Sequence, residues 1–159
     1  MLTIIKLLLF CISTIGSWEL LRRKCNVNVY FLPSITIAIQ TTVLFVGGLL
    51  NLLPEITVIL YLVGFFGIVY GIWKDKSLTF LKNYCCPGFF LMAILMAVFL
   101  IFVKGKLFTH YDNFSHWALV VKVMLQTDRY PNFKDTLIMF QEYPLGSSTY
   151  IYFVAKLIG

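Results

Sequence analysis

Asp112 and His116 are the residues of this chain whose types and spacing best suit catalysis. They lie in the segment Asp-Asn-Phe-Ser-His-Trp, directly after a long hydrophobic stretch, so that an acid and an imidazole are expected at the rim of a membrane. A carboxylate in that position can act as a general base, and a histidine one helical turn away can orient it or bind a phosphate oxygen or a metal. Ionisable groups are costly near lipid and are usually functional where they occur.

A purely structural interpretation of the same residues is also open. Asp112 directly precedes a predicted helix, where an aspartate N-cap is ordinary, and His116 can serve as a structural hydrogen-bond donor. As a metal signature the pair is incomplete, because well-defined sites need three or four ligands. His110, Asp128 and Glu142 would complete such a site only if the fold brought them together.

Composition identifies the solvent of most of this chain as lipid. Of its 159 residues, 60% are hydrophobic and 13% are charged, against roughly 25% charged residues in soluble domains. The net charge of +6 comes from basic residues at the ends of hydrophobic stretches, which indicates control of membrane topology and not a nucleic-acid partner. The four cysteines have no metal-ligand spacing. We expect an all-α, polytopic transmembrane helix bundle in the cell membrane.

The elements that must position the Asp112 segment are four membrane spans. Because about 20 apolar residues cross a bilayer, the spans are expected over residues 2–21, 29–50, 55–73 and 87–103. The chain then divides into four transmembrane helices with short loops (1–104), a loop with an interfacial helix (105–136), and the start of a fifth membrane segment (137–159). Since the chain stops within this last hydrophobic stretch, we expect it to be the N-terminal portion of a longer protein.

Two features within the spans carry structural expectations. Pro33 lies near the start of the second span and is expected to kink it. Gly64, Gly67 and Gly71 lie on one side of the third span, a pattern of small residues that permits close helix packing.

Basic residues predict which side of the membrane each loop faces. Residues 22–24 and 74–82 hold six of them in the first and third loops, which lie on one side if the spans alternate. Lys104 and Lys106 lie on the other side and count against this assignment, but the larger group favours placing the first and third loops in the cytoplasm. The Asp112 loop is then extracytoplasmic.

The segment 113–127 has the pattern of a helix lying in the membrane interface. Its hydrophobic residues fall on one face at helical spacing, with Asp112 and His116 on the opposite face and turn residues at 128–132. The residues expected on the hydrophobic face are Phe114, Trp117, Ala118, Val121, Met124 and Leu125.

The last third of the chain resembles bacterial multi-spanning membrane glycosyltransferases of the GT-C superfamily. The resemblance is carried by the segments 111–117 and 143–146, and by Lys122, Met124, Asp128 and Pro131 between them. It implies an essential acid in an extracytoplasmic loop, a following helix along the membrane surface, and transfer of a sugar from a polyprenyl-phosphate carrier to a cell-envelope acceptor.

The resemblance also implies roles for particular residues. Asp112 matches the catalytic acid and would act as general base on an acceptor hydroxyl, with His116 beside it. Lys122, Arg129 and Tyr143 would contact the substrate, the two basic residues by holding the carrier phosphate. For Lys122 and Arg129, a simple solvated or headgroup-contacting charge remains an equal alternative.

Two departures from the superfamily keep alternatives open. Asn113 stands where many members have a second acid, which leaves a divalent-metal cofactor undecided, and the loop follows a fourth span where better-known members have it after the first. The alternative function is that of a non-enzymatic polytopic membrane protein, a transporter or an assembly subunit, in which Asp112 and His116 line a polar path.

Overall fold

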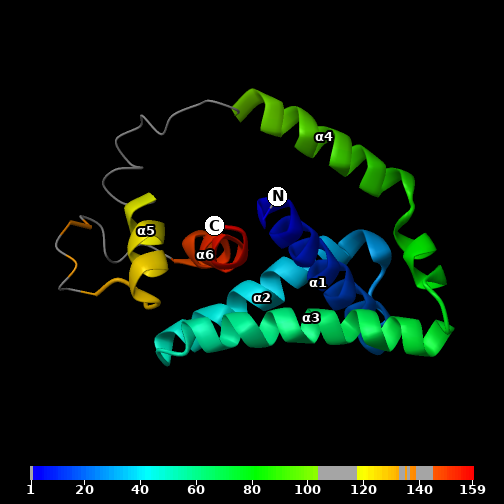
Figure 1. Cartoon of the computed structure of the whole chain (residues 1–159), viewed down its shortest axis with the longest axis horizontal. Coiled ribbons are helices and arrows are strands. Elements are labelled where there is room, and N and C mark those ends of the chain that lie inside the picture. Colours follow the sequence, from blue (N-terminus) through cyan, green and yellow to red (C-terminus); the bar gives the residue numbers. More distant parts are fainter. Residues whose placement is uncertain (1, 104–117, 133–134, 136, 139–144) are drawn as a thin grey trace.

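The computed structural model describes residues 2–103, 118–132, 135, 137–138 and 145–159 (Figure 1). Every regular element within these ranges is a helix, which confirms the all-α class. Asp112, His116 and the segment 139–144 lie outside the described residues, so the predictions made for them stay predictions.

Three helices are long and apolar enough to cross a membrane: α1 (Leu2–Cys25), the unit formed by the short 3-10 helix η1 (Val29–Phe31) with α2 (Leu32–Leu49), and α3 (Leu53–Asp75). The 23 residues of α3 extend about 35 Å at 1.5 Å per residue, enough for a hydrocarbon core of about 30 Å. These helices fit a membrane protein.

The ends of these helices follow from local residue chemistry. Pro33 and Pro54 lie in the first turns of α2 and α3, where a missing N–H costs no hydrogen bond. Pro33 therefore lies where α2 begins, and the predicted role as a kink within a longer helix does not fit its position. Asn26, Asn51 and Lys76 have left-handed backbone angles just beyond the ends of α1, α2 and α3.

The glycine stripe of α3 packs directly against α1, as the sequence predicts. A Cβ added to Gly16 would lie 1.8 Å from the carbonyl oxygen of Gly64, and one added to Gly67 would lie 2.0 Å from the carbonyl oxygen of Gly16. The Ser13 hydroxyl donates to the Tyr61 carbonyl at 3.2 Å. Small residues thus let the two backbones touch, which is the main way that helices associate in lipid.

α1 and α3 run in the same direction and contact each other directly. α2, which connects them in the sequence, runs in the opposite direction. Ser13 lies beside Tyr61, and ten residues further along α1 the Arg23 guanidinium pairs with the Asp75 carboxylate at 2.8 Å. The C-terminal ends of α1 and α3 therefore meet at one end of the bundle, which we call the basic end because it carries residues 22–24 and 74–82. The turn at Asn51 lies at the other end.

The next two elements are η2 (Thr79–Tyr84) and α4 (Pro87–Val103). α4 has the bounds predicted for the fourth span, but its 17 residues make it shorter than the other three candidates. In Figure 1 it runs along one side of the molecule, apart from α2 and α3.

The chain ends with α5 (Ala118–Thr127) and α6 (Gly146–Ile158). In Figure 1 α6 is seen end-on while α3 lies across the view, so α6 crosses α3 at a steep angle. It buries Tyr152 and Phe153 completely or nearly so, and the Phe153 ring stacks on Tyr61 with centroids 4.4 Å apart. The described helix of the predicted fifth membrane segment thus begins at Gly146 and has 13 residues.

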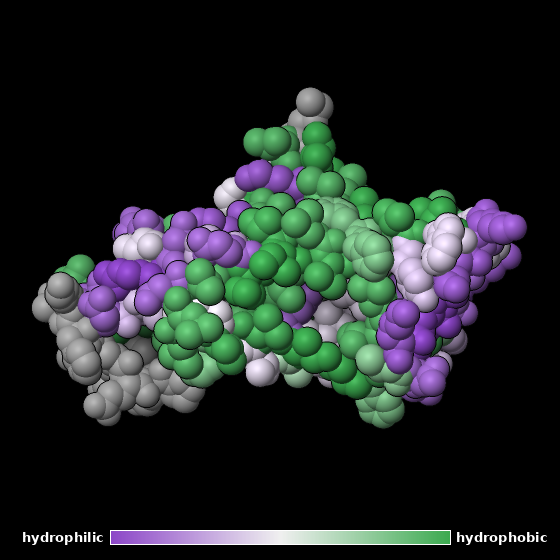
Figure 2. All heavy atoms as spheres, turned by 90° about the horizontal axis from the view of Figure 1, so that it is seen from below, coloured by the Kyte–Doolittle hydropathy of each residue, from purple (hydrophilic) through white to green (hydrophobic). Residues whose placement is uncertain are grey.

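The outer surface of the long helices is apolar. On α3, Phe66, Val69 and Trp73 are each more than 60% exposed. Figure 2 shows hydrophobic surface over the middle of one face, with hydrophilic residues gathered toward the two ends of the long axis. Soluble proteins rarely expose contiguous apolar surface on this scale, whereas a belt between two polar ends suits a bilayer.

Candidate functional site

Of the five predicted site residues, the structure describes Lys122 and Arg129, both in or just after α5. Asp112, His116 and Tyr143 lie outside the described residues. The geometry available for the site is therefore that of α5 and α6, the helices between which the predicted residues fall in the sequence.

α5 is a short helix fixed by two buried side chains. Val120 and Met124, one turn apart, are almost fully buried in the core formed with α6, while Lys122 faces outward and is exposed. Met124 belongs to the predicted hydrophobic face, but Ala118, also placed on that face, is exposed. The helix ends at Asp128, as predicted, with a left-handed backbone angle and its N–H donating to the Met124 carbonyl at 2.9 Å.

Asp128 joins the end of α5 to α6 through its side chain. Its Oδ1 accepts a hydrogen bond from the Tyr152 hydroxyl at 2.8 Å and another from the Lys156 ammonium group. Burial acts to raise the pKa of the Asp128 carboxyl, but the hydrogen bonds from Lys156 and Tyr152 prevail and hold it below its usual value. We call these three residues the Asp128 cluster.

Tyr130 ties the same junction to α2. Its hydroxyl lies 2.9 Å from the Thr149 hydroxyl at the start of α6, and its ring lies over Gly48 near the C-terminal end of α2. A Cβ added to Gly48 would lie 2.4 Å from that ring, so the glycine makes room for it. The α5–α6 junction is thereby held at the end of the bundle opposite the basic end.

Arg129, predicted to hold a phosphate, is ion-paired within the chain. Its Nη1 and Nη2 donate to the two carboxylate oxygens of Asp135 at 2.9 and 3.2 Å, and Nη1 also donates to the Tyr130 carbonyl at 3.0 Å. The Arg129 guanidinium lowers the pKa of the Asp135 carboxyl, with a further contribution from the Asn132 N–H. An arriving phosphate would have to share this arginine with Asp135, whereas Lys122 is solvent-facing.

A second polar cluster lies at the basic end of the bundle. The Glu19 side chain is 0% exposed and accepts hydrogen bonds from Arg22 Nη2 at 2.8 Å, from Arg23, and from the Tyr84 hydroxyl at 2.6 Å. Burial, and after it the hydrogen bond to Glu19, raises the pKa of Tyr84 well above its usual range. We call these four residues the Glu19 cluster.

Neither cluster was predicted from the sequence, although each had a signal. Glu19 is an acid within an apolar stretch, followed by arginines three and four residues on, the spacing at which helical side chains meet. Tyr152 and Lys156 are one turn apart on α6, so one acid can contact both. The pairing with Asp128 itself depends on the tertiary fold.

A metal site is not formed by the part of the chain that the structure describes. No three His, Cys, Asp or Glu residues come together there. Asp128, considered above as a third ligand, has Tyr152 and Lys156 as its partners. All four cysteines are free thiols.

Comparison with known proteins identifies no relative. No protein-family profile matches this chain, no curated protein is significantly similar to it, and no solved structure matches its fold.

Proposed function

We propose that this chain belongs to a multi-pass membrane glycosyltransferase. It transfers a sugar from a polyprenyl-phosphate-linked donor to a cell-envelope acceptor on the extracytoplasmic side. In this proposal α4 is the fourth span, α5 lies along the membrane interface, and the Glu19 cluster faces the cytoplasm.

The observation that carries the proposal is the position of the α5–α6 junction. The Asp112 segment leads directly into α5, and the far end of α5 is anchored by Asp128 to α6 and by Tyr130 to Thr149. This junction lies at the opposite end of the bundle from Arg23 and Asp75, where basic residues indicate the cytoplasm. A general base must be held in register with its substrate, and anchored helices provide such support.

The reaction divides into one bond formed and one bond broken. Asp112 takes the proton from the acceptor hydroxyl while its oxygen bonds to the anomeric carbon of the sugar. The bond from that carbon to the carrier phosphate breaks, and the phosphate leaves with the electron pair. His116 orients Asp112, and Lys122, which is exposed on α5, stabilises the departing phosphate together with Arg129 and Tyr143.

The test is sugar transfer in membranes that contain the complete protein and radiolabelled polyprenyl-phosphate hexoses. Asp112→Asn should lower the rate at least 100-fold at unchanged protein level, because general bases contribute about 10² to 10⁴. Asp75→Asn, an acid at the basic end, serves as the matched control and should retain transfer. Transfer that survives Asp112→Asn removes this residue from the role of base.

Transport assays in the same membranes test the alternative function, that of a transporter. If solute or proton movement depends on Asp112 and His116 while no donor is consumed, the chain belongs to a transporter and not to a transferase.

A further inference from the structure

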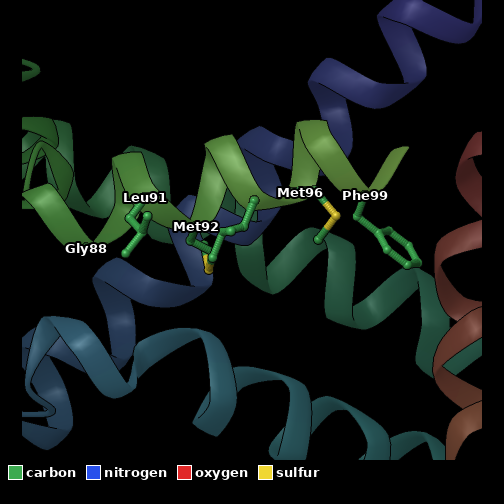
Figure 3. Close-up of a pocket in the computed structure, with 6 residues that line it drawn as sticks. Gly88, Leu91, Met92, Met96 and Phe99 are labelled. Carbon is green, nitrogen blue, oxygen red and sulfur yellow. The ribbon is translucent and has the colours of Figure 1, made fainter. Parts of the chain in front are cut away.

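An apolar cavity lies between α4 and helices α1, α2 and α6. Its volume is about 490 Å³, within the roughly 300–1,000 Å³ of ligand-binding pockets. A neighbouring hollow of about 380 Å³ follows one side of α4, where Leu91, Met92, Met96 and Phe99 project (Figure 3). Met92 and Met96 line both spaces, which therefore adjoin. Further lining comes from Phe10 and Ile15 on α1, Pro33 and Ile37 on α2, and Tyr150 on α6.

Two polar groups in the wall of this cavity have no hydrogen-bond partner among the described residues. They are the indole Nε1 of Trp18 on α1 and the hydroxyl of Thr36 on α2, and both atoms are buried. Thr36 is only 3% exposed. Buried donors are nearly always paired in folded proteins, so these two atoms are candidate donors to a ligand oxygen, although Thr36 also lines a smaller hollow between α1, α2 and α3.

The two groups lie at the same depth below the basic end. Trp18 is four residues before Arg22, and Thr36 is four residues after the start of α2 at Leu32, each about 6 Å along a helix axis. In the membrane embedding proposed above, with Arg22 and the start of α2 at the bilayer rim, both positions are one turn inside that rim. This is the depth at which a membrane lipid has its glycerol and ester oxygens.

We infer that this cavity binds one acyl chain of an anionic glycerophospholipid. The lipid head lies at the basic end, one of its ester or phosphate oxygens accepts hydrogen bonds from Trp18 and Thr36, and its chain runs past Met92 and Met96 toward Phe10. The inference rests on the membrane embedding proposed above and not on sugar transfer. The polyprenyl carrier belongs at the opposite end, so the two lipids are distinct.

Size and charge favour a lipid over a further protein helix. A helix about 10 Å wide occupies roughly 400 Å³ per 5.4 Å turn, so the cavity would hold little more than a single turn. A flexible hydrocarbon chain fits an irregular apolar space without leaving backbone groups unpaired. The segments 19–25 and 74–84 at the basic end hold six Lys and Arg residues against two acids, which favours an anionic head.

Native mass spectrometry of the purified protein in detergent tests the binding. Phosphatidylglycerol is titrated against the wild type and against a double variant, Trp18→Phe with Thr36→Val, which keeps an aromatic ring at position 18 and the shape of the side chain at position 36 but removes both donors. Wild type should bind one molecule that survives detergent exchange, and the variant should lose affinity at least tenfold. The matched control combines Trp73→Phe and Thr42→Val, two exposed residues of the same types, and should bind within twofold of wild type.

Equal binding by the double variant and the wild type would overturn the inference. So would tighter binding of polyprenyl phosphate than of phosphatidylglycerol, which would assign the cavity to the carrier. If lipid binding in the cavity is lost while sugar transfer is intact, the lipid site is wrong and the proposed function is unaffected. If lipid binds but no sugar transfer occurs, the proposed function is wrong and the lipid site is unaffected.

A fluorescence measurement tests whether the acyl chain of the lipid lies beside Trp18. It does not require a variant that lacks the hydrogen-bond donors of Trp18 and Thr36. In a version with Trp73→Phe and Trp117→Phe, Trp18 is the sole tryptophan, and a phospholipid with brominated chains should quench it saturably at about one lipid per protein. In the version that keeps only Trp73, which is 70% exposed, quenching should rise without saturation. Non-saturable quenching of Trp18 would contradict a defined site.

Discussion

The two ends of the bundle each hold a carboxylate that accepts a hydrogen bond from a tyrosine and from a cation, in different surroundings. Glu19 is 0% exposed and bonds to the Tyr84 hydroxyl at 2.6 Å, whereas Asp128 is 39% exposed and bonds to the Tyr152 hydroxyl at 2.8 Å. Two arginines neutralise Glu19, and one half-exposed lysine, Lys156, neutralises Asp128.

This difference in exposure makes the Glu19 cluster rigid and the Asp128 cluster adaptable. Glu19 has no access to water, so every partner it loses leaves a buried charge uncompensated. Asp128 can exchange a protein partner for solvent at little cost. The Glu19 cluster therefore holds α1, α3 and η2 rigidly together, while the Asp128 cluster holds α5 against α6 and can still adjust.

The largest contrast is expected from removing each carboxylate. Glu19→Ala should lower the free energy of unfolding by about 3 kcal/mol, the lower end for a broken buried ion pair, because Arg22 and Arg23 reach some solvent. Asp128→Ala should cost less, about 1 to 2 kcal/mol, because the carboxylate is 39% exposed but the fully buried Tyr152 hydroxyl loses its acceptor. Thermal unfolding in detergent measures both, and equal losses would contradict the contrast.

Removing each tyrosine hydroxyl should give a smaller difference in the same direction. Tyr84→Phe should destabilise by about 2 kcal/mol, the range of a hydrogen bond to a charged group, since no water can replace it at Glu19. Tyr152→Phe should cost about half as much because Asp128 is partly solvated. Tyr70→Phe, which keeps the ring beside Lys24, is the control and should be neutral.

The next effect is that of acid on the stability that the Asp128 cluster contributes. The pKa of Asp128 lies below its usual value of 3.8, so its folded-state interactions contribute stability above pH 3.8 and lose it as the pH falls through the lowered value. The stability difference between wild type and Asp128→Asn should therefore be constant from pH 7 to about 5 and should vanish at lower pH. A difference that grows on acidification would be inconsistent with a lowered pKa.

The smallest expected effect is that of salt on the exposed ion pair. Lys156→Met should cost about 0.5 kcal/mol at low salt and nothing measurable at 1 M, because the pair is partly exposed and salt screens it. Arg22→Met should cost more and should be insensitive to salt, since Glu19 is fully buried. A strong salt dependence of the Arg22 variant would place Glu19 in contact with solvent.

Local patterns predicted the helices and their closest contact. Hydrophobic length located the three long helices and α4, Asp128 marked the end of α5, and the glycine spacing anticipated close helix packing on that side of α3, although not that α1 is the partner. These features depend on residues close in sequence, which is why the sequence alone contains them.

Features that depend on tertiary contacts were missed or misplaced. One miss was local: α1 continues to Cys25, four residues beyond the predicted span, and Glu19 pairs with Arg22 and Arg23 at helical spacing within it. α5 buries Val120 where Ala118 was expected, because ten residues fix a helix face only to within about one position. The partners of Asp128 and Arg129 lie on segments that hydrophobic periodicity does not bring together.

The two ends of the bundle are most directly compared by cysteine labelling in intact cells. In a version without the four native cysteines, Ser115→Cys reports on the Asp112 segment, and Thr79→Cys, exposed in η2, reports on the basic end. We predict that a membrane-impermeant thiol reagent labels the first from outside and labels the second only after the membrane is opened. Labelling of Ser115→Cys only in opened cells would place Asp112 in the cytoplasm and contradict the proposed extracytoplasmic sugar transfer.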